Sequence, residues 1–151
     1  MGNCNKDIRG CIGCHKCKST GRCVFDKDMV NELAPKLEQA DGLVVGSPVY
    51  FAGPNGTLTN LMDRLFFSTP FSKCMKAGAA VVSARRAGTT AALDRLNKYF
   101  QLAEMPVVSS RYWNMVHGNT LAFLVRAIVA ERERGGLPDA EPVRVSTNFI
   151  R

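Results

Sequence analysis

The chain has 151 residues, 46% of them hydrophobic, which is enough for one domain around one core. Its formal net charge is +7, but the lysines and arginines are spread along the chain, so we expect no nucleic-acid partner. The electrostatic field of this positive charge attracts phosphorylated cofactors equally well. No apolar stretch approaches the ~18 residues of a membrane span, and no secretory signal is present, so we expect no membrane partner and a cytoplasmic location.

Cysteines are concentrated near the N-terminus, where five of the six fall within the first 23 residues. Because the cytosol keeps thiols reduced, this concentration favours metal or redox chemistry over a disulfide framework. We interpret residues 1–151 as a single domain. It comprises a cysteine-rich loop at 1–25, βα units and a final helix over 26–134, and an extended tail at 135–151.

Hydrophobic periodicity predicts the elements in chain order. Apolar residues at helical spacing predict a helix over 28–40, kinked at 31–34 because Pro35 removes an internal hydrogen bond. Uniformly apolar runs predict strands at 42–47, 77–83 and 105–109, with helical patterns around 58–65 and 92–100 between them. A last helix is predicted over 120–134, where two glycines and a proline follow it.

Strands in which apolar and polar residues do not alternate, and which are separated by helices, are typical of a parallel sheet covered by helices on both faces. The predicted fold class is therefore α/β. In such a sheet, ligands bind at the carboxyl ends of the strands, which places a site among the loops 47–56, 83–90 and 110–119.

Four motifs in this order resemble the NADPH-dependent FMN reductase and iron-sulfur flavoprotein family. They are Gly10-Cys-Ile-Gly-Cys-His-Lys-Cys17 with Cys23, Gly46-Ser-Pro-Val-Tyr-Phe51, Ser83-Ala-Arg-Arg-Ala-Gly-Thr89 and Tyr112-Trp-Asn-Met-Val-His-Gly118. The resemblance implies a flavodoxin-like fold, bound FMN, and hydride transfer from NAD(P)H to the flavin. The flavin would then reduce a small acceptor or an iron-sulfur cluster, in a homo-oligomer that is a dimer or a tetramer.

The resemblance places cofactor-binding residues in two loops. The candidates are Ser47, Pro48, Val49, Tyr50, Phe51 and Gly53 in the first loop, and Ser83, Arg85, Arg86, Gly88 and Thr89 in the second. Aromatic rings suit contact with a flavin, an arginine suits an anionic flavin or a nicotinamide phosphate, and a threonine can cap the next helix. An ordinary βα loop and solvated arginines are the alternative interpretation.

The cysteines Cys11, Cys14, Cys17 and Cys23 follow the pattern C-x2-C-x2-C-x5-C, similar to ferredoxin spacings. By the resemblance they would bind a [4Fe-4S] cluster. A zinc site, a disulfide or free thiols stay open, although structural zinc usually needs two separated C-x2-C pairs. We expect Cys74 to be a small buried hydrophobe. No catalytic role is assigned to His15 or His117.

The sequence departs from the family pattern in two places. The usual N-terminal βαβ unit with its phosphate-binding loop does not precede Gly2, and a stretch between Thr120 and Leu121 is shortened. Without that unit the edge of the 42–47 strand would be open, and we expect low monomer stability and weak FMN binding. The alternative functions are a non-catalytic degenerate paralogue and a metal-binding module without flavin.

Overall fold

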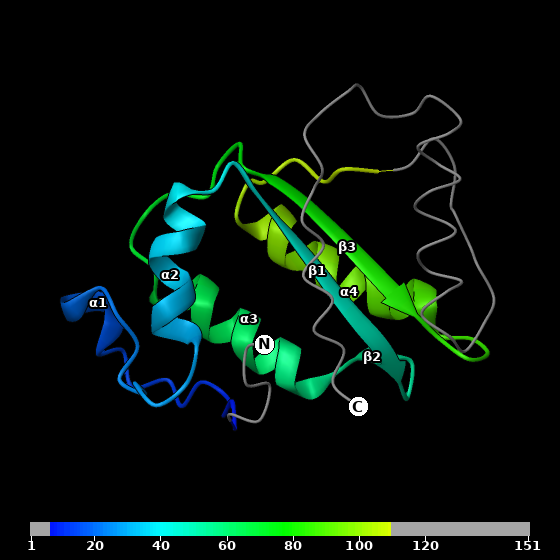
Figure 1. The fold of residues 1–151 in the computed structure, drawn as a ribbon, viewed down its shortest axis with the longest axis horizontal. Coiled ribbons are helices and arrows are strands. Elements are labelled where there is room, and N and C mark those ends of the chain that lie inside the picture. The colour runs from blue at the N-terminus through cyan, green and yellow to red at the C-terminus, as the bar shows by residue number, and fades with distance from the viewer. Residues whose placement is uncertain (1–6, 110–151) are drawn as a thin grey trace.

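The structure, a computed structural model, describes residues 7–109 (Figure 1). In chain order the elements are α1 (Cys17–Thr20), α2 (Val30–Gln39), β1 (Gly42–Tyr50), β2 (Gly53–Pro54), α3 (Gly56–Ser68), β3 (Ala77–Ser83) and α4 (Thr89–Leu102). The expected helix at 120–134, the tail at 135–151 and the loop at 110–119 lie outside the described residues. Among the described ones, no helix is both long and apolar enough to cross a bilayer.

The sheet has the strand order β2-β1-β3. β1 and β3 are parallel and in register from Gly42 opposite Ala77 to Pro48 opposite Ser83, which confirms both strands and the α/β class. The predicted strand at 105–109 is reduced to one parallel bridge between Val107 and Gly78. The third strand was therefore predicted at the right residues but too long.

A tight hairpin replaces the first part of the loop predicted at 48–56. β1 continues to Tyr50, and its last two residues pair antiparallel with the two residues of β2. Phe51 and Ala52 form the turn with φ angles of 49° and 60°, in the left-handed region that non-glycine residues seldom adopt. Because glycine is the usual signal for such a turn, the sequence did not indicate it.

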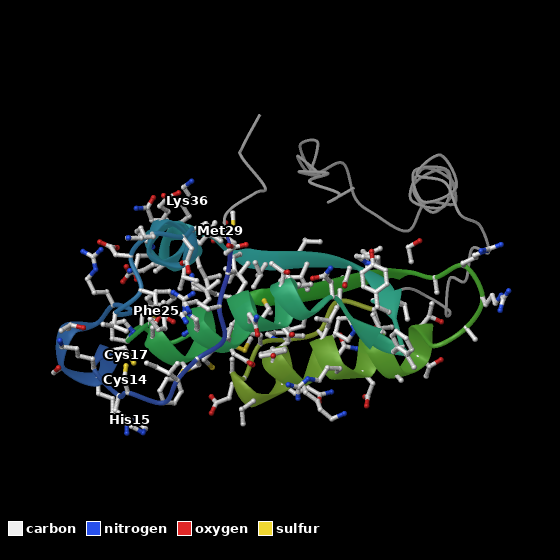
Figure 2. All side chains as sticks on the ribbon, turned by 90° about the horizontal axis from the view of Figure 1, so that it is seen from below. Cys14, His15, Cys17, Phe25, Met29 and Lys36 are labelled. Atoms are coloured by element: carbon white, nitrogen blue, oxygen red, sulfur yellow. The ribbon has the colours of Figure 1, made fainter. Side chains whose placement is uncertain are left out.

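The main core lies between the sheet and the helices α3 and α4, which cover the same face of β1 and β3 (Figure 2). Val45 points into this core and packs with Met62, Leu96 and Phe100, whereas Val44 on the other face is 63% exposed. Within residues 7–109 the helices therefore cover one face of the sheet.

Helix α2 packs against α3 through a second apolar cluster of Val30, Leu37 and Leu65. The helix begins at Val30 and ends at Gln39, slightly inside the predicted range, and it runs without interruption across Pro35. This packing fixes the segment that follows the cysteines against the body of the domain.

We predict that Phe100→Ala lowers the free energy of unfolding by about 3–5 kcal/mol, because the ring is fully buried and its removal leaves a cavity. Leu102→Ala in the same helix is the control, since this side chain is 90% exposed. Urea unfolding measures both. Equal destabilisation by the two variants would contradict this assignment of the core.

Candidate functional site

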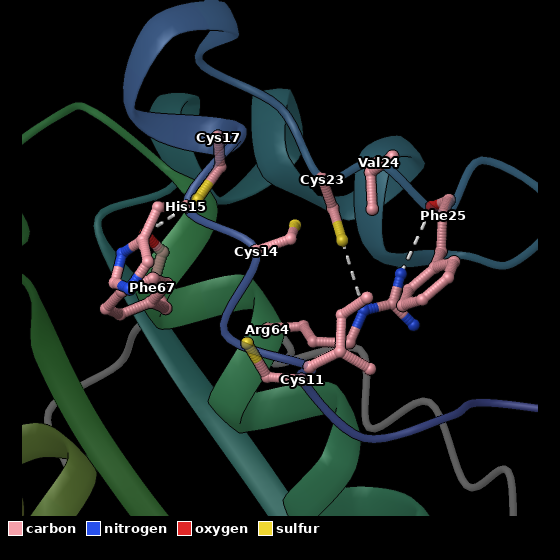
Figure 3. A pocket seen from close by; sticks show the side chains of 10 residues that line it. Cys11, Cys14, His15, Cys17, Cys23, Val24, Phe25, Arg64 and Phe67 are labelled. Carbon is pink, nitrogen blue, oxygen red and sulfur yellow. Dashed lines mark hydrogen bonds between the residues drawn. The ribbon is translucent and has the colours of Figure 1, made fainter.

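All four cysteines of the motif line one pocket, together with Arg64 and Phe67 of α3 (Figure 3). Cys11 and Cys14 are exposed, Cys17 and Cys23 are partly buried, and all four are free thiols. The structure thus brings together side chains that span 13 positions of sequence. It does not form the disulfide that was one of the alternatives.

Local backbone geometry bends the cysteine segment around this pocket. The short helix α1 begins at Cys17 and ends at Thr20. Gly21 caps it with a φ of 67° that suits glycine, and the Gly21 N–H donates to the Cys17 carbonyl over 2.9 Å. Residues 1–25 were predicted to be an irregular loop, so α1 is an addition to that prediction. The turn after α1 carries the chain back toward the pocket, where Cys23 completes its lining.

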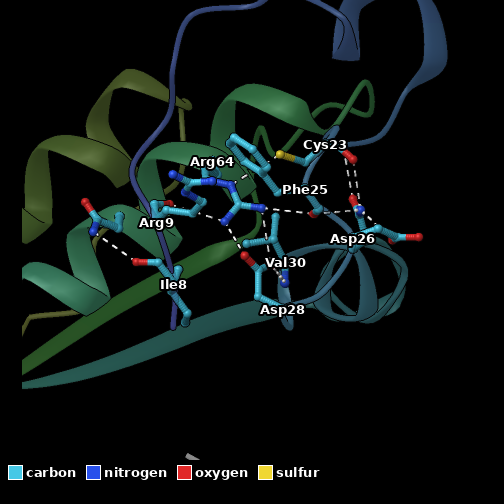
Figure 4. Close-up of polar contacts among 10 residues, drawn as sticks. Ile8, Arg9, Cys23, Phe25, Asp26, Asp28, Val30 and Arg64 are labelled. Carbon is cyan, nitrogen blue, oxygen red and sulfur yellow. Dashed lines mark hydrogen bonds and ion pairs between the residues drawn. The ribbon is translucent and has the colours of Figure 1, made fainter. Parts of the chain in front are cut away.

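Arg64 anchors this segment from α3 (Figure 4). Its side chain is 1% exposed and forms a buried two-pronged ion pair with Asp28. The same guanidinium donates to the carbonyls of Arg9 at 3.2 Å and Phe25 at 3.1 Å, and its Nε donates to Cys23 Sγ at 3.2 Å. One side chain therefore connects the residues before Cys11 with those after Cys23.

Electrostatics keep Arg64 charged in this position. Burial opposes the charge, but the hydrogen bonds and Coulomb attraction of Asp28 and Cys23 outweigh burial and raise the pKa of the guanidinium. Asp28 in turn accepts a hydrogen bond of 3.1 Å from the Val30 N–H at the start of α2. The pair thus joins α2, α3 and the cysteine segment.

A second anchor holds the backbone of Cys23. The Asn31 side chain accepts from the Cys23 N–H at 2.9 Å and donates to the Cys23 carbonyl at 3.0 Å. Sequence reasoning missed Asp28, Asn31 and Arg64, because each reads as an ordinary polar residue of a helix. The sequence did offer one signal for Arg64. It lies next to the apolar stripe of Leu61 and Leu65, where a charged residue indicates a buried ion pair.

The structure also places Cys74 and a histidine of the pocket, and it bears on single-metal binding. Cys74 is exposed, contrary to the expected burial, because it lies in the surface loop between α3 and β3. His15 packs edge-on against Phe67 with ring centroids 5.8 Å apart. In the part of the chain that the structure describes, no three His, Cys, Asp or Glu side chains are close enough to hold a single metal ion.

The two predicted cofactor loops meet at the carboxyl edge of β1 and β3. Gly88 has a φ of 92°, and a Cβ there would lie 2.8 Å from the Ala52 Cα and 3.2 Å from Val49 Cγ1. The absence of a side chain at Gly88 therefore lets the loop after β3 touch the hairpin after β1. Gly88 also occupies the cap position of α4, so the expected Thr89 cap is wrong and Thr89 is the first helical residue.

Ser47 has a structural contact inside this edge. It is buried, its hydroxyl donates to the Pro48 carbonyl at 2.8 Å, and it accepts from the Asn55 N–H at 2.7 Å. The Asn55 side chain caps α3 by accepting from the Thr57 N–H at 2.7 Å. This chain of contacts fixes the start of α3 relative to β1.

The remaining candidates are arranged around the Gly88 contact. Tyr50 and Phe51 are exposed aromatic rings at the hairpin tip, and Arg85 and Arg86 are exposed in the loop after β3. Ser83, Pro48, Val49 and Gly53 lie in or beside the strand ends, partly buried. The edge therefore presents apolar rings and positive charge together.

Helix α1, which begins at Cys17, and the hairpin of β1 and β2 lie toward opposite ends of α3 (Figure 1). Asn55 caps the helix beside the hairpin, whereas Arg64 and Phe67 reach the cysteines near its other end. Thirteen residues of helix separate the two ends by about 20 Å at 1.5 Å per residue. The sequence motifs thus form two sites within the described part of one chain.

Comparison with known proteins identifies the family. The sequence pattern of NADPH-dependent FMN reductase matches residues 5–120, well over half of the chain. The protein belongs to this family of flavin-linked oxidoreductases. A WrbA-like flavodoxin from Agrobacterium tumefaciens has a similar structure, with a TM-score of 0.53 and 19% identity over 68% of this chain and 72% of that one. This similarity confirms the flavodoxin-like fold.

Two relatives are iron-sulfur flavoproteins. The one from Methanocaldococcus jannaschii is 35% identical over 122 residues, covering 77% of this chain and 61% of the relative. The one from Methanosarcina thermophila is 29% identical over 127 residues, covering 78% of this chain and 66% of the relative. The chain thus spans about two thirds or less of the length of each of these relatives.

We predict that Arg64→Met lowers the free energy of unfolding by about 3–5 kcal/mol, because it leaves the Asp28 carboxylate buried without its partner. Arg22→Met is the matched control, since Arg22 pairs with Asp26 in the same segment but at the surface. Chemical unfolding checks both. A similar midpoint for the two variants would show that the buried pair does not hold the segment.

Proposed function

We propose that the chain is an FMN-dependent NAD(P)H oxidoreductase whose flavin binds at the carboxyl edge of β1 and β3. The observation that carries this proposal is the contact of Gly88 with the hairpin, in a chain of the FMN reductase family. It joins the two loops that supply all the predicted cofactor residues. Bound FMN would supply the chemistry, accepting a hydride from NAD(P)H and reducing a small acceptor.

The residues of this edge have separate roles in the proposal. Tyr50 and Phe51 offer exposed rings to the flavin and the nicotinamide, and the tight turn limits their movement. Arg85 and Arg86 form no ion pair within residues 7–109, so their charges are available to a phosphate or an anionic flavin. Ser47 holds the edge in place through Asn55 and does not need to touch the ligand.

The cysteine pocket supports a second redox group, a [4Fe-4S] cluster held by Cys11, Cys14, Cys17 and Cys23. Four free thiols around one pocket form the donor set that such a cluster needs. A cubane binds each cysteine through a different iron atom, so its ligands stand farther apart than those of a single ion. Structural zinc sites usually take two separated C-x2-C pairs, a pattern that these four cysteines do not follow. Both relatives compared above are named iron-sulfur flavoproteins.

The flavin site is tested by Gly88→Ala, which forces a side chain into a left-handed residue and against Ala52. Relieving that clash moves the loop after β3 away from the hairpin, so we expect FMN to bind about tenfold more weakly. Gly56→Ala is the control, because a Cβ there meets nothing within 4 Å. Quenching of flavin fluorescence measures both affinities. Unchanged FMN affinity in Gly88→Ala would place the flavin elsewhere.

The cluster is tested by replacing single cysteines with serine. Each of the substitutions Cys11→Ser, Cys14→Ser, Cys17→Ser and Cys23→Ser removes one ligand, so we expect iron and sulfide to fall to a small fraction of the wild-type content. Cys74→Ser, an exposed cysteine outside the pocket, should retain both. The measurement is an assay of iron and sulfide in each variant, on protein prepared without oxygen. A wild-type protein that binds zinc instead would contradict the cluster.

A further inference from the structure

The guanidinium of Arg64 makes contacts that a purely structural ion pair does not require. Besides the two prongs to Asp28 and the two carbonyls, its Nε–H points at Cys23 Sγ over 3.2 Å. An arginine has five N–H donors, and five acceptor atoms surround this one. The side chain is therefore fully satisfied and fixed, with one donor committed to a sulfur of the cysteine pocket.

Anchoring on both sides makes the N–H···S contact rigid. Asp28 holds the outer edge of the guanidinium, while Asn31 fixes the backbone of Cys23 through its N–H and its carbonyl. The guanidinium cannot turn away without breaking a buried hydrogen bond, and the Cys23 backbone cannot do so without breaking a partly buried one. The donor and the sulfur thus keep their separation when the electron content of the site changes.

A donor aimed at a ligand sulfur has a defined effect on a cluster. When a cluster gains one electron, charge builds up on its thiolate sulfurs, and a hydrogen bond to a sulfur stabilises that reduced state. The bond is stronger when the donor is cationic. Because Asp28 neutralises the charge of Arg64 nearby, the main contribution comes from the directed N–H and not from net charge.

We propose that Arg64 is a positioning residue that raises the reduction potential of the cluster by donating its Nε–H to Cys23 Sγ, with Asp28 holding it in place. This assignment rests on the proposed [4Fe-4S] cluster. The affected step is the one-electron reduction of the cluster, for which dithionite supplies the electron in the titration below, and no bond forms or breaks and no proton moves. Cys23 would therefore differ from the other three ligands in carrying an arginine donor from α3.

The test uses the full chain with its cluster and measures the midpoint potential by redox titration followed by electron paramagnetic resonance. Arg64→Lys keeps a buried cation opposite Asp28 but loses the planar fork that reaches the sulfur, so we expect the potential to fall. The double variant Arg64→Met with Asp28→Asn removes both charges without leaving one unpaired. Its midpoint potential should also lie below that of the wild type. Arg22→Lys, the same exchange at the exposed pair with Asp26, should leave the potential unchanged.

The outcomes separate this assignment from the proposed cluster. Loaded variants with the wild-type potential would overturn the role of Arg64 and leave the cluster standing. Loss of the cluster in both variants would reduce Arg64 to a structural anchor and equally overturn the role. If Arg64→Lys alone fails to bind iron, the double variant decides through its potential. A wild-type chain without iron and sulfide would overturn the cluster and this assignment together.

Discussion

The parallel pairing of β1 with β3 is the constraint on which the rest of the structure depends. It brings the carboxyl ends of the two strands to one edge, where Gly88 and the Phe51–Ala52 turn touch. It also fixes the start of α3, because Ser47 at the end of β1 binds the backbone of Asn55. Arg64 lies nine positions after Asn55 on the same helix, so its position is fixed as well. The contact between the two loops and the position of Arg64 both follow from the same pair of strands.

Helix α3 is fixed by β1 and in turn fixes the cysteine segment, which has little apolar surface of its own to bury. The segment is held instead by polar contacts, with Arg64 binding the carbonyls of Arg9 and Phe25 and the sulfur of Cys23. Buried polar contacts specify position well only when every donor is satisfied, as it is here. The result is a thiol-lined pocket fixed to the same helix as the strand edge, near the opposite end of that helix.

The elements that local patterns encode were predictable from the sequence. The strand at 77–83 has the predicted bounds. The four cysteines of the C-x2-C-x2-C-x5-C pattern line one pocket, and their role as cluster ligands stays a prediction. What depends on distant partners was not predictable. Arg64 acquires its role only through Asp28 and Cys23, more than 35 positions away, and the hairpin depends on two non-glycine residues in left-handed conformations. Cys74 was misjudged because an isolated cysteine carries no pattern from which its burial can be inferred.

Anaerobic titration of the FMN-loaded chain with NADPH, followed by flavin absorbance, tests directly whether the chain is a nicotinamide-dependent flavin enzyme. We expect the flavin bands to bleach with one NADPH per flavin, since a hydride carries the two electrons that FMN accepts. A flavin that stays oxidised with both NADPH and NADH, yet bleaches with dithionite, would contradict the account. The strand edge would then bind flavin without serving as a nicotinamide-dependent oxidoreductase.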